Sequence, residues 1–140
     1  MENKETNGLK WDNNYLLGND LVDAEHRQLF DLVNGLVRSC NDDQSALELG
    51  KELDFLANYT VQHFADEENL QIISNYPEYK THKKLHEDFK LVVTDLVKRF
   101  NTTGSSTELS NDVKRIVVRW LINHILMEDK KIGVHLRTCG

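Results

Sequence analysis

The 140-residue sequence contains few residues that interrupt helices, and few cysteines. One proline and seven glycines leave long stretches in which nothing breaks a helix, so long helices are expected. The two cysteines, Cys40 and Cys139, lack the spacing of a metal-binding motif. Two free thiols are therefore expected, which is typical of a protein in the reducing cytoplasm.

The sequence also lacks a long apolar run and an excess of basic residues. The longest unbroken apolar runs have only three or four residues, whereas a membrane-spanning helix needs about 20. The N-terminal stretch MENKETNGLK contains no apolar core of the kind found in signal peptides. The formal net charge is -6, and the basic residues are scattered among the acidic ones. These features predict a cytoplasmic protein whose partners are neither a nucleic acid nor a membrane.

Turn-forming residues divide the sequence into four long segments. They lie around residues 40–45, 74–79 and 101–107, and Pro77 cannot continue a helix that begins far upstream. We predict one domain over 1–140, with an N-terminal arm over 1–20, helices at about 21–40, 45–73, 78–100 and 108–129, and a short C-terminal tail. Because short connections favour antiparallel neighbours, the expected fold class is all-α, an up-down-up-down antiparallel four-helix bundle with an extended N-terminal arm.

Each segment carries a stripe of residues at steps of three and four positions, a spacing that places them on one inward face of a helix. The stripes read Val22, His26, Leu29/Phe30, Val33 and Leu36/Val37; Leu49, Leu53, Leu56, Thr60, His63, Glu67 and Leu70; Tyr79, His82, His86, Phe89, Val93, Leu96 and Phe100; and Leu109, Val113, Ile116/Val117, Trp120, His124 and Met127. Five of the six histidines fall on these stripes, together with a glutamate. Burying so many polar groups without partners costs several kcal/mol each, whereas a shared metal site would provide the partners.

The five histidines also lie at one depth in the predicted bundle. Counted from the expected turns near residues 42 and 104, the histidines of neighbouring helices differ by only a few positions, which corresponds to roughly one helical turn. In an antiparallel bundle these positions meet in one layer near one end. The sequence therefore predicts a metal site to which all four helices contribute.

A further carboxylate ligand is expected after His124. On a regular α-helix Glu128, four positions on, shares the face of His124 better than Asp129, five positions on, so periodicity alone favours Glu128 slightly. Seven ligands exceed the four of a closed zinc site and the six of one octahedral ion, which indicates two metal ions that share carboxylates. Imidazole and carboxylate ligands suit iron. With an oxide or hydroxide bridge, one coordination position stays open for a small diatomic molecule such as O2.

At this point the sequence resembles the hemerythrin family in its bacterial single-domain form. The resemblance extends from Trp11 to about Gly133 and rests on Trp11, Tyr15 and Gly18, followed by DAEH (23–26), HFADEE (63–68), YPEYKTHKKLH (76–86) and WLINHILMED (120–129). It implies that one iron is bound by His82, His86 and His124, and the other by His26 and His63. It further implies that Glu67 and Asp129 bridge the two irons, which selects Asp129 over Glu128, and that O2 binds at the iron held by His26 and His63.

The sequence also leads to expectations about residues near these motifs. Four apolar residues beside the ligands are candidates for lining an O2 pocket, although plain core packing explains them equally well: Phe30, Phe64, Trp120 and Leu121. Glu25 stands where the family often has glutamine, and Gln71 stands where methionine is common. Glu25, Asp66 and Glu68 are expected to face solvent, and His135, outside every stripe, is expected to be a surface residue.

The leading functional prediction is reversible O2 binding at an oxo- or hydroxo-bridged di-iron centre, for oxygen transport, storage or scavenging, without enzymatic activity. Three alternatives stay open. The protein acts as an O2 or redox sensor through a partner protein, as a di-iron enzyme on peroxide or nitric oxide, or as a bundle that holds structural zinc.

Overall fold

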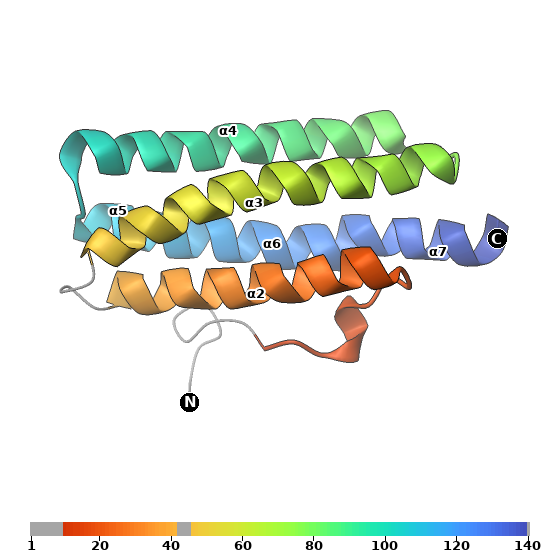
Figure 1. Ribbon diagram of the computed structural model, residues 1–140, viewed down its shortest axis with the longest axis horizontal. Coiled ribbons are helices and arrows are strands. Elements are labelled where there is room, and N and C mark those ends of the chain that lie inside the picture. The colour runs from red at the N-terminus through yellow and green to blue at the C-terminus, as the bar shows by residue number, and fades with distance from the viewer. Residues whose placement is uncertain (1–9, 42–45, 140) are drawn as a thin grey trace.

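The computed structural model describes residues 10–41 and 46–139, and it consists of helices packed side by side (Figure 1). A short 3-10 helix, η1 (Asn13–Tyr15), precedes three long helices, which are α2 (Asp20–Asn41), α3 (Ala46–Ile73) and α4 (Tyr79–Thr103). The fourth long helix runs through α5 (Thr107–Val113), η2 (Lys114–Val118), α6 (Arg119–Asn123), η3 (His124–Asp129) and α7 (Lys130–Cys139). Successive long helices run in opposite directions, so the predicted antiparallel four-helix bundle is confirmed.

Local hydrogen bonds fix several helix ends. At the start of α2, the Asn19 side chain accepts from the backbone N–H of Val22 at 3.1 Å, and the Asp23 carboxylate accepts from that of Leu17 at 2.8 Å. At the start of α5, the Ser106 hydroxyl accepts from the backbone N–H of Leu109 at 3.0 Å. Gly104 ends α4 with a φ of 73°, a conformation that glycine adopts without strain. These polar caps place the turns close to the predicted positions.

The predicted C-terminal tail is wrong, because residues 130–139 continue the fourth helix as α7. No proline interrupts this segment, and a single glycine weakens a helix by only about 1 kcal/mol. Ile132 is fully buried, and a Cβ atom on Gly133 would lie 2.4 Å from the backbone oxygen of Leu17. The N-terminal arm therefore lies directly against α7 and gives this extra helix a surface to pack on.

The fourth helix changes its winding twice. Both η2 and η3 are π-helical, with hydrogen bonds that span five residues instead of four. Each π-helical segment changes the direction in which the following side chains point around the helix axis, compared with a continuous α-helix. Met127, which the regular stripe predicts to face inward, is therefore 64% exposed, whereas Ile125 and Asp129 are buried. The predicted inward position of Met127 is wrong for this reason.

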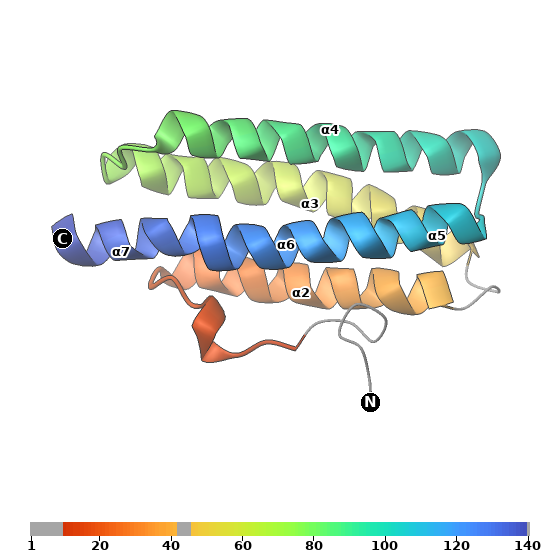
Figure 2. The same ribbon diagram turned by 180° about the vertical axis from the view of Figure 1, so that it is seen from behind.

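Two groups of buried apolar residues form the core. The larger group fills the bundle from its middle to the end where α2 gives way to α3, and it includes Leu53, Phe89 and Val117. The smaller group, called the end cluster below, consists of Leu17, Val22, Tyr76 and Ile132, with Leu70 and Leu136 against its edge. The end cluster closes the opposite end of the bundle, where α2 begins and where α7 extends beyond the start of α2 (Figure 2).

The backbone of the N-terminal arm lies along the outside of the bundle, while the side chains of Tyr15 and Leu17 reach the two groups of buried apolar residues. Its described part runs beside α2 (Figure 2), and the rings of Trp11 and Tyr15 lie 5.1 and 4.6 Å from that of Phe30. Cys40 is a buried, free cysteine, while the side chain of Cys139 lies outside the described part of the structure. Among the described helices, none is long and apolar enough to cross a membrane.

Candidate metal centre

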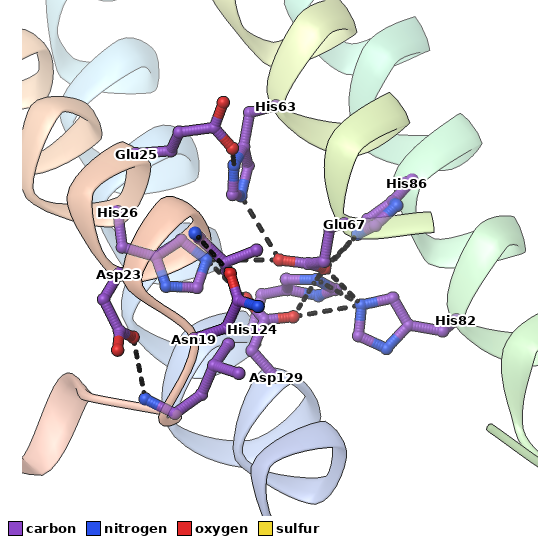
Figure 3. A network of polar contacts seen from close by, with 12 residues as sticks. Asn19, Asp23, Glu25, His26, His63, Glu67, His82, His86, His124 and Asp129 are labelled. Atoms are coloured by element: carbon purple, nitrogen blue, oxygen red, sulfur yellow. Dashed lines mark hydrogen bonds and ion pairs between the residues drawn. The ribbon is translucent and has the colours of Figure 1, made fainter. Parts of the chain in front are cut away.

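Seven polar side chains converge between the two apolar groups (Figure 3). α2 contributes His26, α3 contributes His63 and Glu67, α4 contributes His82 and His86, and η3 contributes His124 and Asp129. All seven are at most 5% exposed. The structure thus brings together all seven residues that the sequence and the family resemblance single out as metal ligands.

The Glu67 carboxylate lies at the middle of this cluster (Figure 3). Its Oε2 lies 3.2 Å from Nε2 of His26 and 3.3 Å from Nε2 of His63. Its Oε1 lies 2.8 Å from Nε2 of His82 and 2.9 Å from Nε2 of His86. One oxygen of the same carboxylate therefore faces each of two groups of histidines, as a carboxylate that bridges two metal ions must.

Asp129 divides its oxygens between the same two groups. Its Oδ2 lies 3.0 Å from Nε2 of His26, and its Oδ1 lies 3.0 Å from Nε2 of both His82 and His124. Glu128, by contrast, points outward, with a side chain that is 32% exposed and pairs with Lys131 at 3.3 Å. The periodicity argument for Glu128 is wrong because η3 is π-helical, and in a π-helix the residue five positions on takes the place above the first.

The ligand atoms form two sets that share both carboxylates. One set contains Glu67, His82, His86, His124 and Asp129, and the other contains His26, His63, Glu67 and Asp129. Within each set, all the donor atoms lie within 4.8 Å of one another. Both sets consist of imidazole nitrogens and carboxylate oxygens, the donor types that suit iron, manganese or zinc.

The contacts inside the cluster fit metal coordination better than hydrogen bonding. Nε2 of His124 lies 3.2 Å from that of His86 and 3.1 Å from that of His82. Nitrogens held at about 2.1 Å from one ion, at right angles to each other, lie about 3 Å apart. Both oxygens of Asp129 also have no hydrogen-bond partner among the described residues, despite their short distances to three histidines. The lone pairs thus converge on common centres, so these residues fit bound metal ions.

The charges of the cluster depend on one another. Burial lowers the pKa of His26, His82 and His124, but the nearby carboxylates of Asp129 and Glu67 outweigh burial and raise these pKa values to about 9, 10 and 9, respectively. Burial raises the pKa of Glu67 and Asp129, but the surrounding histidines outweigh it and hold both pKa values below their usual range. Without metal, ionised carboxylates and protonated imidazoles thus stabilise each other, and metal binding must displace these protons.

Two further carboxylates, which lie outside the cluster, contact histidines within it. Glu25 lies 3.0 Å from Nδ1 of His63, and Glu68 lies 2.8 Å from Nδ1 of His86. Acceptors in these positions place the ring proton on Nδ1 and leave the Nε2 lone pair free to bind metal. The expectation that Glu25 and Glu68 face solvent is therefore wrong. Each one adjoins a cluster residue in sequence but contacts a histidine on a neighbouring helix, and helix periodicity alone does not reveal such a pairing.

Aromatic rings cover part of the cluster. Phe64 stacks on His86, with ring centroids 3.9 Å apart, and Trp120 stacks on His124 at 4.2 Å. Phe30 contacts the rings of the N-terminal arm, and Leu121 belongs to the larger apolar group. Of the four pocket candidates, Phe64 and Trp120 are thus the two that lie directly on histidines of the cluster.

His135 lies near this end of the bundle but outside the cluster. Its Nε2 donates to the backbone oxygen of Ser74 at 2.7 Å, and its ring lies 5.5 Å from that of Tyr76. The half-buried His135 therefore links α7 to the turn between α3 and α4. The expectation of a plain surface residue is wrong, because residues 130–139 form α7 instead of the predicted tail, and this helix brings His135 against the turn.

Comparisons with known proteins agree with this geometry. The family model described as the hemerythrin HHE cation binding domain matches residues 17–135. The bacteriohemerythrin of Methylococcus capsulatus is 36% identical over 112 residues, which span 80% of this chain and 83% of that protein. The myohemerythrin of Sipunculus nudus is 33% identical over 121 residues, spanning 86% and 88% of the two chains. A crystal structure of wild-type hemerythrin superimposes with a TM-score of 0.80 at 31% identity, covering 91% of this chain and 97% of that one. The chain belongs to the hemerythrin family.

Proposed function

We propose that this protein binds O2 reversibly at a pair of iron ions, for oxygen transport, storage or scavenging. His82, His86 and His124 would hold one iron, His26 and His63 would hold the other, and Glu67 and Asp129 would bridge them. Hemerythrins bind O2 at such a di-iron centre. The observation that carries the proposal is that two buried ligand sets of unequal size share both carboxylates.

The unequal numbers of histidines would give the two metal positions different roles. Three histidines, two shared carboxylates and one oxide or hydroxide bridge would fill the six positions of an octahedral ion. The set with only two histidines, His26 and His63, would leave one position of such an ion open. The iron pair would supply the site and the electrons for O2 binding, and the open position would be on the side of His26 and His63.

The surrounding protein would orient the ligands and exclude water. Glu25 and Glu68 hold the rings of His63 and His86, one in each set. Phe64 and Trp120 cover two histidines of the larger set with apolar surface. Because all seven ligands are nearly inaccessible, protons from bulk water reach the centre poorly. A site so well shielded from bulk solvent favours the release of O2 over irreversible oxidation of the iron.

An oxygenation cycle tests the proposal. The iron-loaded protein would be reduced without oxygen, exposed to O2 and then deoxygenated, while its visible absorption is followed. We expect an absorption band that appears with O2 and disappears when O2 is removed. Irreversible conversion to the oxidised form within one cycle would contradict a carrier function. Zinc in place of iron after purification from iron-replete cells would contradict the di-iron centre itself.

The same preparation separates the carrier from an enzyme and from a sensor. Sustained consumption of O2, peroxide or nitric oxide in the presence of a reductant would identify a di-iron enzyme. A protein partner that is bound in only one of the oxygenated and deoxygenated states would identify a sensor. We expect neither result, because each would require an activity beyond O2 binding.

A further inference from the structure

Gln71 is a fully buried amide that the metal centre does not use. Its side chain is 0% exposed, and neither Oε1 nor Nε2 has a hydrogen-bond partner among the described residues. Buried amides without partners are rare in native proteins, because they lose their hydrogen bonds to water and gain nothing in return. The position therefore calls for a ligand that can bond with the amide.

The helix register places Gln71 between the metal centre and the end cluster. The contact of 3.2 Å between His26 and Glu67 puts these two residues at the same level of α2 and α3. One turn further along α3 lies Gln71, and one turn back along α2 lies Val22, a member of the end cluster. Gln71 thus belongs to the layer where the polar centre meets the apolar end of the bundle.

His26 has an unpartnered atom on its other side. Its Nε2 faces Glu67 and Asp129, but its Nδ1 is buried and has no hydrogen-bond partner in the described part of the chain. When Nε2 binds a metal, the ring proton lies on Nδ1, which then becomes a buried donor. His63 and His86 have Glu25 and Glu68 as acceptors at this atom. No described residue supplies such a carboxylate to His26.

The general direction of side chains on a helix brings the two unpartnered groups toward one layer. Side chains on a helix tilt toward the N-terminus of that helix. Since α2 and α3 are antiparallel (Figure 1), this rule directs a side chain at position 26 toward the end cluster and one at position 71 back toward the metal centre. A buried donor and a buried amide therefore approach the same layer from opposite sides.

We propose that His26 and Gln71 share a buried water molecule at this layer. The water accepts from the Nδ1–H of His26 and donates to Oε1 of Gln71. Ordered waters commonly satisfy buried polar groups in this way. In this role Gln71 is a positioning residue, because through the water it keeps the His26 ring in the tautomer that offers Nε2 to a metal. The inference rests on the proposed di-iron site. It assigns a partner to Nδ1 of His26, which is buried and has no hydrogen-bond partner among the residues that the structure describes.

Metal binding by variants tests the inference. Gln71→Met keeps the length of the side chain but removes both polar atoms. Thr60→Val is the matched control, because Thr60 lies on the same buried face of α3 and its hydroxyl donates to the backbone oxygen of Ala57 in the same helix, at 3.0 Å. Metal-free wild type and both variants would be titrated with Fe(II) without oxygen.

We expect Gln71→Met to bind its second iron about 10-fold more weakly than wild type, the lower end of the usual effect of losing an outer hydrogen bond to a ligand histidine, because the contact runs through a water and methionine is itself common at this position in the family. Thr60→Val should bind both irons as wild type does. Equal affinities in all three proteins would overturn the inference. A wild type that binds fewer than two irons would instead count against the proposed function, so the two failures differ.

A crystal structure of the iron-loaded wild type gives an answer that does not depend on how the variant folds. We expect density for a water molecule within hydrogen-bond distance of both Nδ1 of His26 and Oε1 of Gln71. A direct contact between the two side chains, or a dry layer without density there, would overturn the hydration site.

Discussion

Oδ1 of Asp129 lies 3.0 Å from Nε2 of His124, although the two residues are five positions apart in one helix. On a regular α-helix these side chains would diverge by more than a quarter turn. The π-helical winding of η3 brings them to one face and turns Glu128 outward. The local winding of the fourth helix therefore decides which acidic residue enters the metal centre.

Substitution of the two neighbouring acids tests this arrangement. Asp129→Asn keeps the volume of the side chain but removes the charge of a shared carboxylate, so we expect it to retain at most one iron per chain. Glu128→Gln should retain two, because Glu128 lies outside the cluster. Iron content per chain, measured after loading without oxygen, decides the matter. Similar iron loss in both variants would contradict the role assigned to Asp129.

Replacing His82 or His135 by alanine should affect iron binding differently. His82→Ala removes a cluster ligand and should lose at least one iron. His135→Ala should keep both irons, but it removes the hydrogen bond to Ser74 and should lower the free energy of unfolding by about 1 kcal/mol. Iron content and urea unfolding of both variants check these outcomes. Equal iron loss in the two would argue against the ligand assignment.

The pH dependence of stability should differ with and without metal. The pKa values of His26, His82 and His124 are raised to between about 9 and 10, above the usual value near 6.5. In the metal-free protein their stabilising contribution is complete below pH 6.5 and disappears as the pH rises through 9 to 10. We therefore expect the Tm of the metal-free protein to fall over this range.

Bound metal should reverse this trend, because it binds only neutral imidazoles and competes with protons. The difference in Tm between the loaded and metal-free proteins should therefore widen between pH 6.5 and 9. Thermal unfolding of both forms at a series of pH values measures it. A difference that stays constant would show that the histidines do not exchange protons for metal.

Gly133 is the contact point between α7 and the N-terminal arm. A Cβ atom there would lie 2.4 Å from the backbone oxygen of Leu17, so Gly133→Ala forces the arm or the helix to move. We expect the free energy of unfolding to fall by about 1–3 kcal/mol, despite the better helix propensity of alanine. Val134→Ala, at an exposed neighbour, should change it by less than about 0.5 kcal/mol. A stabilised Gly133→Ala variant would show that the arm does not pack against α7.

Regular helices explain why so much of the site follows from periodicity. Five of the seven ligand candidates lie on α2, α3 and α4, which are regular α-helices throughout: His26, His63, Glu67, His82 and His86. On such helices, residues three or four positions apart share one face. Asp129 lies in η3, where that rule fails, and only the likeness to hemerythrins selected it. On α3 the spacing predicted Leu70 as the next inward residue after Glu67, but Gln71 is the fully buried one. Small differences in helix phase thus decide which of two neighbours enters the core.

By itself, the sequence determined the four-helix bundle and the layer in which five histidines meet, because apolar spacing and helix length depend only on local geometry. Tertiary structure alone decided the partners that cross between helices: Glu25 with His63, Glu68 with His86, and His135 with the turn after α3. It also decided that α7 extends beyond the metal centre against the N-terminal arm. These pairings depend on how far each helix is rotated about its axis and on how close neighbouring axes approach, which a one-dimensional pattern does not contain.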